Sequence, residues 1–387
     1  MVFSSSTFLM AFLPLTLLLY YGVGVALTKN VTVKNCILLL ASLVFYAWGE
    51  PVYIVLMLLS ILFNFAAGRV IDNALADGRT GLARFQFVVD VLYNLAVLGF
   101  FKYADFVVDN VNGLFGAHIP ALSLPLPIGI SFYTFQILSY IIDLYTGKIR
   151  VQKDLVSFAL YISLFPQLIA GPIVKYKEIE EQLVGRKESL VKYSRGMARF
   201  VVGLAKKLLL ANTLGAVYSG IQGMDVGSLS ALTAWTGIAC YTLQIYFDFS
   251  GYSDMAIGLG QMFGFQFGEN FRYPYIATSI TDFWRRWHIS LSSWFRDYVY
   301  IPLGGNRVSK GRWVFNTFVV WMLTGLWHGA AWNFVLWGLL FAFLLTVEKF
   351  LLKKWMDKLP GWLVRLPILV VLAISFVVFN ASSLAQA

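Results

Sequence analysis

The stretch DFWRRWHISLSSWFRDYVYIPLGGNR (Asp282–Arg307), together with TFVVWMLTGLWHGAAW (Thr317–Trp332) that follows it, decides how the rest of the chain is interpreted. These two segments hold two of the three histidines of the protein, His288 and His328, each directly after a tryptophan. Imidazole is the side chain best suited to move a proton in either direction near neutral pH. Acid–base chemistry in this protein is therefore expected here.

The residues around His288 predict one amphipathic helix that begins at Thr281. Its aromatic face carries His288 with Trp284, Trp287, Leu291, Phe295 and Tyr298. Its polar face carries Arg285, Ser292 and Arg296. Such a helix suits a membrane interface or the wall of a cavity. The alternative interpretation of His288 is a packed interfacial residue without chemistry.

His328 lies in an almost uncharged run that begins at Trp313, with Gly325 and Gly329 on either side of it. Glycines at this spacing let another helix or a substrate approach the backbone closely. A polar ring in such a run is unfavourable unless it has a partner or faces water, which favours a functional role. The alternative is a structural hydrogen bond to a neighbouring helix. His118, in the loop GAHIP, is expected to be an exposed loop residue.

The composition predicts an all-α, polytopic membrane protein. Of 387 residues, 59% are hydrophobic and 13% are charged, whereas a soluble domain carries about 25% charged residues. The long uncharged runs fit membrane helices and not a barrel. The formal charge of +10 lies in short basic clusters between the apolar runs, as expected for cytoplasmic flanks. Membrane lipid is therefore a predicted partner, and nucleic acid is not.

Hydropathy predicts ten membrane spans, and the basic clusters place the N-terminus outside. The spans are Phe8–Leu27, Asn35–Trp48, Val52–Ala67, Phe85–Val108, Leu126–Tyr145, Phe200–Ile221, Leu229–Phe249, Trp313–Ala331, Phe334–Leu352 and Val364–Asn380. Two further regions are expected to enter the bundle without crossing it. Region 155–174 is broken by Pro166 and by Gly171-Pro172, and region 250–312 is aromatic and basic.

Other polar residues allow fewer conclusions. Asp248 and Asp254, at the end of a predicted span, are expected either to neutralise an arginine of the 285–296 helix or to line a polar tunnel. The isolated Cys36 and Cys240 predict no disulfide and no metal site. The chain has no GxSxG, HExxH or Walker motif, which argues against a serine hydrolase, a zinc protease and an ATP-driven pump.

Six motifs together resemble the membrane-bound O-acyltransferase (MBOAT) family, and within it the branch that acylates bacterial polysaccharides. They are LLLASLVFYAWGEP, LPIGISFYTFQILSYIID, LFPQLIAGPI, QIYFDFSGYSDMAIG, DFWRRWHISLSSWFRDYVYIPLGGNR and TGLWHGAAWNFVLWG. They are distributed over nearly the whole chain, and the last two are highly specific. Members of this branch usually continue beyond the segment matching VVFNASSLAQA, where this sequence stops.

The resemblance implies one integral-membrane acyltransferase domain over residues 1–387, either a short member or one without the last helices of the family. The family fold is a helical ring around a thin centre with a tunnel. The implied reaction moves an acyl group, in particular acetyl, from a cytoplasmic thioester to a hydroxyl of an extracytoplasmic polysaccharide such as alginate, or to a relay protein. The donor is expected to be acetyl-CoA or an acyl carrier thioester, with no bound cofactor. Periplasmic acetyltransferases are expected partners, and the bacterial inner membrane is the expected location.

In this family the histidine of LWHG, here His328, is regarded as catalytic, and the histidine of WRRWHISL, here His288, is the second residue linked to activity. We expect His328 to be the base, and His288 to polarise the thioester or to assist the leaving thiol. Candidate residues for binding the anionic donor are Arg285, Arg286, Arg296, Trp327 and Asp248. Two alternatives remain at this stage: a transporter or channel, and a scaffold for periplasmic transferases without catalysis of its own.

Overall fold

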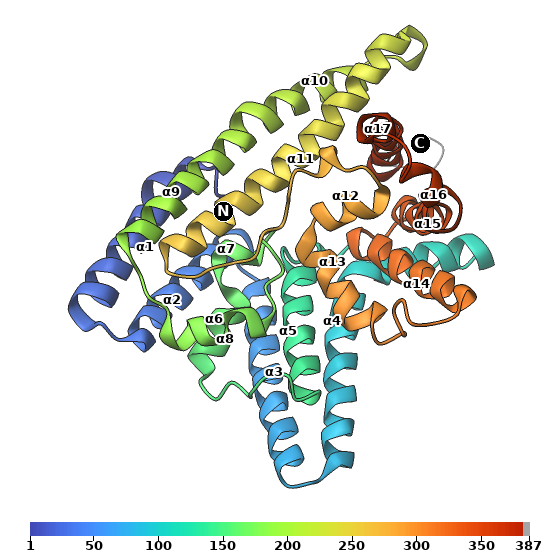
Figure 1. Cartoon of the computed structure of the whole chain (residues 1–387). Coiled ribbons are helices and arrows are strands. Elements are labelled where there is room, and N and C mark those ends of the chain that lie inside the picture. Colours follow the sequence, from blue (N-terminus) through green and yellow to red (C-terminus); the bar gives the residue numbers. More distant parts are fainter. Residues whose placement is uncertain (382–387) are drawn as a thin grey trace. The chain divides into compact units, whose positions relative to one another are not determined.

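The computed structural model describes residues 1–381, and every regular element in this part of the chain is a helix (Figure 1). The chain divides into two compact units. Unit 1 comprises Met1–Leu204 and Asp254–Gly268, and unit 2 comprises Ala205–Ser253 and Glu269–Ala387. The two histidine motifs both belong to unit 2. The prediction of a single domain stays a prediction.

Seven helices among residues 1–381 are long and apolar enough to cross a membrane. They are Phe8–Thr28, Val31–Gly49, Tyr53–Ala76, Thr80–Phe115, Leu190–Gln222, Trp332–Met356 and Gly361–Asn380. In the apolar 18-residue stretch that qualifies each helix as a span, only 17% to 39% is buried inside the protein. Apolar helix surface left outside on this scale needs lipid to cover it. The prediction of an all-α, multi-pass membrane protein is confirmed.

The predicted count of ten spans is not confirmed, because three of the predicted spans are not among these seven. The first, Leu126–Tyr145, is shortened to α5 (Ile130–Tyr145), whose 16 residues extend only about 24 Å. The second, Leu229–Phe249, belongs to the longer and more polar α11 (Ala231–Met262). The third, Trp313–Ala331, corresponds to α14 (Lys310–His328), which begins with charged residues. The orientation across the membrane stays a prediction.

Unit 1 is built on antiparallel neighbours such as α3 with α4, and α4 with α5 (Figure 1). Its helices are α1 (Leu13–Leu18), α2 (Val31–Gly49), α3 (Tyr53–Ala76), α4 (Thr80–Phe115), α5, α6 (Leu155–Ser163), α7 (Phe165–Leu168), α8 (Tyr176–Gly185) and α9 (Leu190–Ala205). The predicted break in region 155–174 is present, since α6 ends at Ser163. Pro166 then occupies the first turn of α7, where its missing N–H is tolerated. His118 is exposed in the loop after α4, as predicted.

Unit 2 contains α10 (Asn212–Gln222), most of α11, α12 (Ile280–Arg286), α13 (Ile289–Phe295), α14, α15 (Trp332–Val347), α16 (Lys353–Met356) and α17 (Gly361–Asn380). Helices α14 and α15 form a tight hairpin. A Cβ atom on Gly325 would lie 2.2 Å from the carbonyl oxygen of Phe334, and one on Gly338 would lie 2.2 Å from that of Trp321. The predicted close approach at Gly325 is therefore confirmed, and the approaching element is helix α15.

The predicted continuous helix from Thr281 is wrong, because the chain breaks between α12 and α13. Trp287 is extended and His288 has a left-handed backbone, with φ of 45°. The N–H of Ile289 donates to the carbonyl of Asn270 at 3.0 Å, and the N–H of Arg272 donates to that of Arg286 at 2.9 Å. In a continuous helix, the N–H of Ile289 and the carbonyl of Arg286 would form hydrogen bonds within the helix. Here they are bonded to residues 270–272 instead. A left-handed non-glycine residue costs about 1–3 kcal/mol and persists only when its surroundings enforce it.

An aromatic core fixes α12 in unit 2. Its buried members include Phe283, Trp284, Trp287, Trp337, Phe341, Ile368, Leu372 and Phe376. The ring of Trp284 lies edge-on to those of Trp321 at 4.7 Å and Phe341 at 4.8 Å. Helices α12, α14, α15 and α17 thereby form one packed body around the histidine motifs.

Candidate active site

One cavity of about 750 Å³ in unit 2 is lined by both His288 and His328. Its wall comes from α12, α13, α14 and the helix 332–356, with further residues from the start of α17. The volume lies in the range of small-molecule sites in proteins. Because α12 and α13 are separate helices, residues from both faces of the helix predicted from sequence, such as Trp284 and Arg285, border the same space.

His328 is the last residue of α14 and is partly buried. Aromatic rings surround it at edge-on angles, with centroid distances of 5.1 Å to Trp327, 5.4 Å to Trp337 and 5.2 Å to Phe379. The carbonyl end of a helix favours positive charge by about 0.3–1 kcal/mol. An imidazolium formed at His328 by taking up a proton is therefore stabilised by its position in α14.

His288 is almost fully buried, with 2% of its surface exposed. Its Nδ1 lies 3.2 Å from Oδ1 of Asn270, while its Nε2 has no hydrogen-bond partner among residues 1–381. Burial holds the pKa of His288 well below its ordinary value, and the nearby His328 lowers it further. His288 is therefore neutral at neutral pH and can accept a proton.

Trp327 contacts both histidines. Its ring centroid lies 5.8 Å from that of His288 and 5.1 Å from that of His328. The indole is 8% exposed and is not among the residues that line the cavity. Trp327 therefore packs against both imidazoles, and its predicted contact with a donor stays a prediction.

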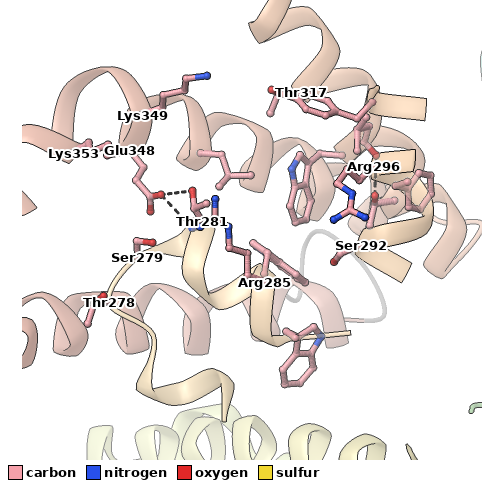
Figure 2. Close-up of a pocket in the computed structure, with 18 of the residues that line it drawn as sticks. Thr278, Ser279, Thr281, Arg285, Ser292, Arg296, Thr317, Glu348, Lys349 and Lys353 are labelled. Carbon is pink, nitrogen blue, oxygen red and sulfur yellow. Dashed lines mark hydrogen bonds between the residues drawn. The ribbon is translucent and has the colours of Figure 1, made fainter. Parts of the chain in front are cut away.

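Basic side chains outnumber acidic ones in the wall of the cavity. Arg285, Arg296, Lys349 and Lys353 border it, against the two carboxylates of Glu348 and Asp357. Glu348 accepts hydrogen bonds from Thr281 (Figure 2) and from the backbone N–H of Ile280 at the start of α12. Arg296 pairs with Asp297 at 2.8 Å. The wall of the cavity thus has a surplus of positive charge that favours an anionic ligand.

Two residues predicted to bind the donor lie away from the cavity. Arg286 pairs with Asp282 at 2.9 Å, one helical turn earlier. Asp248 pairs with Lys207 at 2.6 Å. Asp254, in unit 1, pairs with Arg199 at 2.9 Å. The interpretation that Asp248 and Asp254 neutralise an arginine of segment 285–296 is therefore wrong, because basic residues that precede them in the chain occupy their carboxylates.

No sequence pattern predicts several residues at this site. Asn270 and Ser290 contact Nδ1 of His288, and no motif or spacing connects Asn270 with a histidine 18 positions later. Lys349 and Lys353 were interpretable only as cytoplasmic flanks of a span, although both line the cavity. The fold brings these lysines to the same cavity as the two histidines.

The chain matches the model of the membrane-bound O-acyltransferase family over residues 147–385, well over half of its length. The matched region includes both histidines and the whole cavity. The protein therefore belongs to this family and is a multi-pass membrane O-acyltransferase, which confirms the resemblance seen in the motifs.

Three relatives show how far the similarity extends. The chain is 43% identical to a probable alginate O-acetylase of Pseudomonas aeruginosa, over 99% of this chain and 73% of that protein. It is 35% identical to the peptidoglycan O-acetyltransferase of Helicobacter pylori, over 100% of this chain and 78% of that protein. It is 30% identical to the teichoic acid D-alanyltransferase of Bacillus subtilis, over 68% and 71% respectively. All three are acyltransferases, and their names give different acceptors.

Proposed function

We propose that this protein transfers an acyl group, in particular acetyl, from a cytoplasmic thioester to a hydroxyl of a polysaccharide outside the membrane, or to a protein that relays it there. The observation that carries the proposal is one cavity bordered by two histidines and by four basic side chains. Similarity to proteins named for alginate and peptidoglycan O-acetylation favours a polymer as the final acceptor. We place this reaction in a bacterial inner membrane, with periplasmic acetyltransferases as partners.

In the proposed reaction, the hydroxyl oxygen attacks the carbonyl carbon of the thioester directly. His328 takes the hydroxyl proton as the new C–O bond forms. The C–S bond then breaks with its electron pair on sulfur, and the thiolate takes up the proton to leave as a thiol. No protein nucleophile is required. The end of α14 stabilises the imidazolium that exists between these two proton transfers.

The surplus of basic side chains in the cavity supports an anionic donor. Acetyl-CoA and a carrier-bound phosphopantetheine thioester both have phosphate groups joined to an uncharged thioester arm. Arg285 and Arg296 are suited to the phosphates, and the tryptophans that line the same cavity are suited to the arm. The donor is a substrate, and the proposed chemistry needs no resident cofactor or metal.

Release of thiol tests the proposal. Proteoliposomes with the purified protein should release free thiol from acetyl-CoA, or from an acyl carrier thioester, in the presence of an alginate acceptor and the periplasmic partners. Release should require both donor and acceptor. A protein that moves acetyl-CoA or the polymer across the bilayer, without breaking the thioester of either donor, would contradict the proposal.

The cavity arginines should govern the requirement for donor. A charged hydrogen bond contributes about 1.5–3 kcal/mol, and 1.4 kcal/mol is a factor of ten. Replacing Arg285 or Arg296 by Gln should raise the donor KM about tenfold or more with little change in kcat, since the contact exists in ground and transition states alike.

Arg286→Gln is the matched control, because Arg286 neighbours Arg285 but pairs with Asp282 outside the cavity. Its donor KM should stay within about twofold of the wild-type value, since a partly exposed pair of this kind contributes only about 0–1 kcal/mol. Equal effects of Arg285→Gln and Arg286→Gln would remove the cavity arginines from donor binding.

A further inference from the structure

The side chain of Asn270 is fully buried directly beside His288. Its Oδ1 lies 3.2 Å from Nδ1 of His288, 3.2 Å from the backbone nitrogen of Ser290 and 2.9 Å from Oγ of Ser290. Its Nδ2 donates to Oγ of Ser253 at 3.0 Å. The backbone carbonyl of Asn270 also accepts the N–H of Ile289, next to the strained backbone of His288. One residue therefore holds both the ring and the main chain of this histidine.

These contacts fix the orientation of the amide. A backbone N–H can only donate, so the Asn270 atom that faces the nitrogen of Ser290 must be oxygen. The reversed amide would place two donors against each other at 3.2 Å. An oxygen that faces Nδ1 of His288 in turn requires the ring proton to be on Nδ1. Oγ of Ser290, 3.5 Å from the same Nδ1, donates its own proton to Asn270 and leaves a lone pair on that side.

We propose that Asn270 is a positioning residue that holds His288 as the Nδ1–H tautomer, so that the lone pair of the ring is on Nε2, the nitrogen without a hydrogen-bond partner among residues 1–381. This inference rests on the proposed function, in which His288 borders the reacting groups. It changes the role expected from the sequence. A neutral His288 in this tautomer cannot donate a hydrogen bond from Nε2 to a thioester carbonyl or to a leaving thiolate.

His288 is thus a hydrogen-bond acceptor at Nε2, whereas the hydroxyl proton itself goes to His328 as proposed above. Burial lowers the pKa of the His288 ring, which keeps the ring neutral and leaves the lone pair on one nitrogen.

The tautomer can be measured without any acyl transfer. The protein has only three histidines, so ¹⁵N spectra of histidine-labelled protein in lipid bilayers contain three imidazoles. His118→Gln and His328→Gln spectra identify the signals of His288. The wild-type protein should show His288 with a protonated Nδ1 and an unprotonated Nε2. A protonated Nε2 on neutral His288 would overturn the inference, whatever the enzymatic activity.

Two substitutions connect the tautomer with the rate. Asn270→Asp keeps an acceptor at the Oδ1 position and should retain the proton on Nδ1, while its carboxylate raises the pKa of His288. Asn270→Leu removes the acceptor, and should release Nδ1 and lower kcat about 10–100-fold with little change in donor KM, as for other groups that orient a histidine. Ser253→Ala removes only the outer bond of the network and should have a small effect. A wild-type kcat in Asn270→Leu would overturn the inference, whereas absence of transfer in the wild type would contradict the proposed function instead.

Discussion

Replacing His328 by Gln should lower the rate of acyl transfer about 10²–10⁴-fold, the usual effect of removing a positioned base. Glutamine is similar in size and can occupy the space between the rings of Trp337 and Phe379. Its amide does not take up a proton at neutral pH. The variant should therefore insert and accumulate normally, while its kcat falls and its donor KM changes little. The measurement is the initial rate of polymer acylation by purified protein, normalised to protein amount.

Two further variants show whether a loss of rate in His328→Gln comes from the missing base. His328→Ala should show the same loss of rate, with an added loss of stability because the space among the aromatic rings is left empty. His118→Gln should leave the rate unchanged, because His118 is exposed in a loop of unit 1. A near-normal rate in His328→Gln would make His328 a packing residue and leave the reaction without its proposed base.

Replacing His288 should produce the second-largest effect, about 10²-fold in kcat, provided that its strained backbone is preserved. His288 has φ of 45°, a conformation that asparagine and glycine tolerate better than alanine does. His288→Asn and His288→Gly are therefore better tests than His288→Ala, since a loss of rate in them cannot be attributed to backbone strain. Some activity should remain, because water can replace part of a hydrogen-bond acceptor.

Rescue by a small molecule would support this assignment. His288→Gly leaves a gap next to the cavity, and added imidazole should restore part of its rate but none of the rate of His328→Gln in the same assay. Full activity of His288→Asn without additives would show that the ring acts only in packing.

The sequence predicted the class of fold and the two histidines because both are local signals. Apolar runs of span length and a polar ring in an uncharged helix are visible without any knowledge of packing. The break between α12 and α13 was not predictable, because it depends on backbone bonds to residues 270–272. Local periodicity indicated one continuous helix there, and the alternative bonds belong to a distant segment.

The sequence also could not predict which of two neighbouring arginines, Arg285 or Arg286, borders the cavity. Arg285 and Arg286 are adjacent and chemically identical, and successive side chains on a helix point about 100° apart. The aromatic core of unit 2 turns Arg285 toward the cavity and leaves Arg286 beside Asp282. Similarly, Lys207 lies far from Asp248 in the chain, and only the fold brings them together. Direction and pairing depend on tertiary packing, which the sequence pattern does not contain.

The most direct test of the central claim is a single-turnover transfer in proteoliposomes. The labelled acyl thioester is placed on the side of the basic residues, and the polymer acceptor with its partners on the other side. Wild-type protein should move the label from the thioester to an ester of the acceptor, with an equal amount of free thiol, and the otherwise intact His328→Gln protein should do so at least about 10²-fold more slowly. Equal rates for the two proteins, or label that crosses the bilayer still attached to sulfur, would contradict acyl transfer at this cavity.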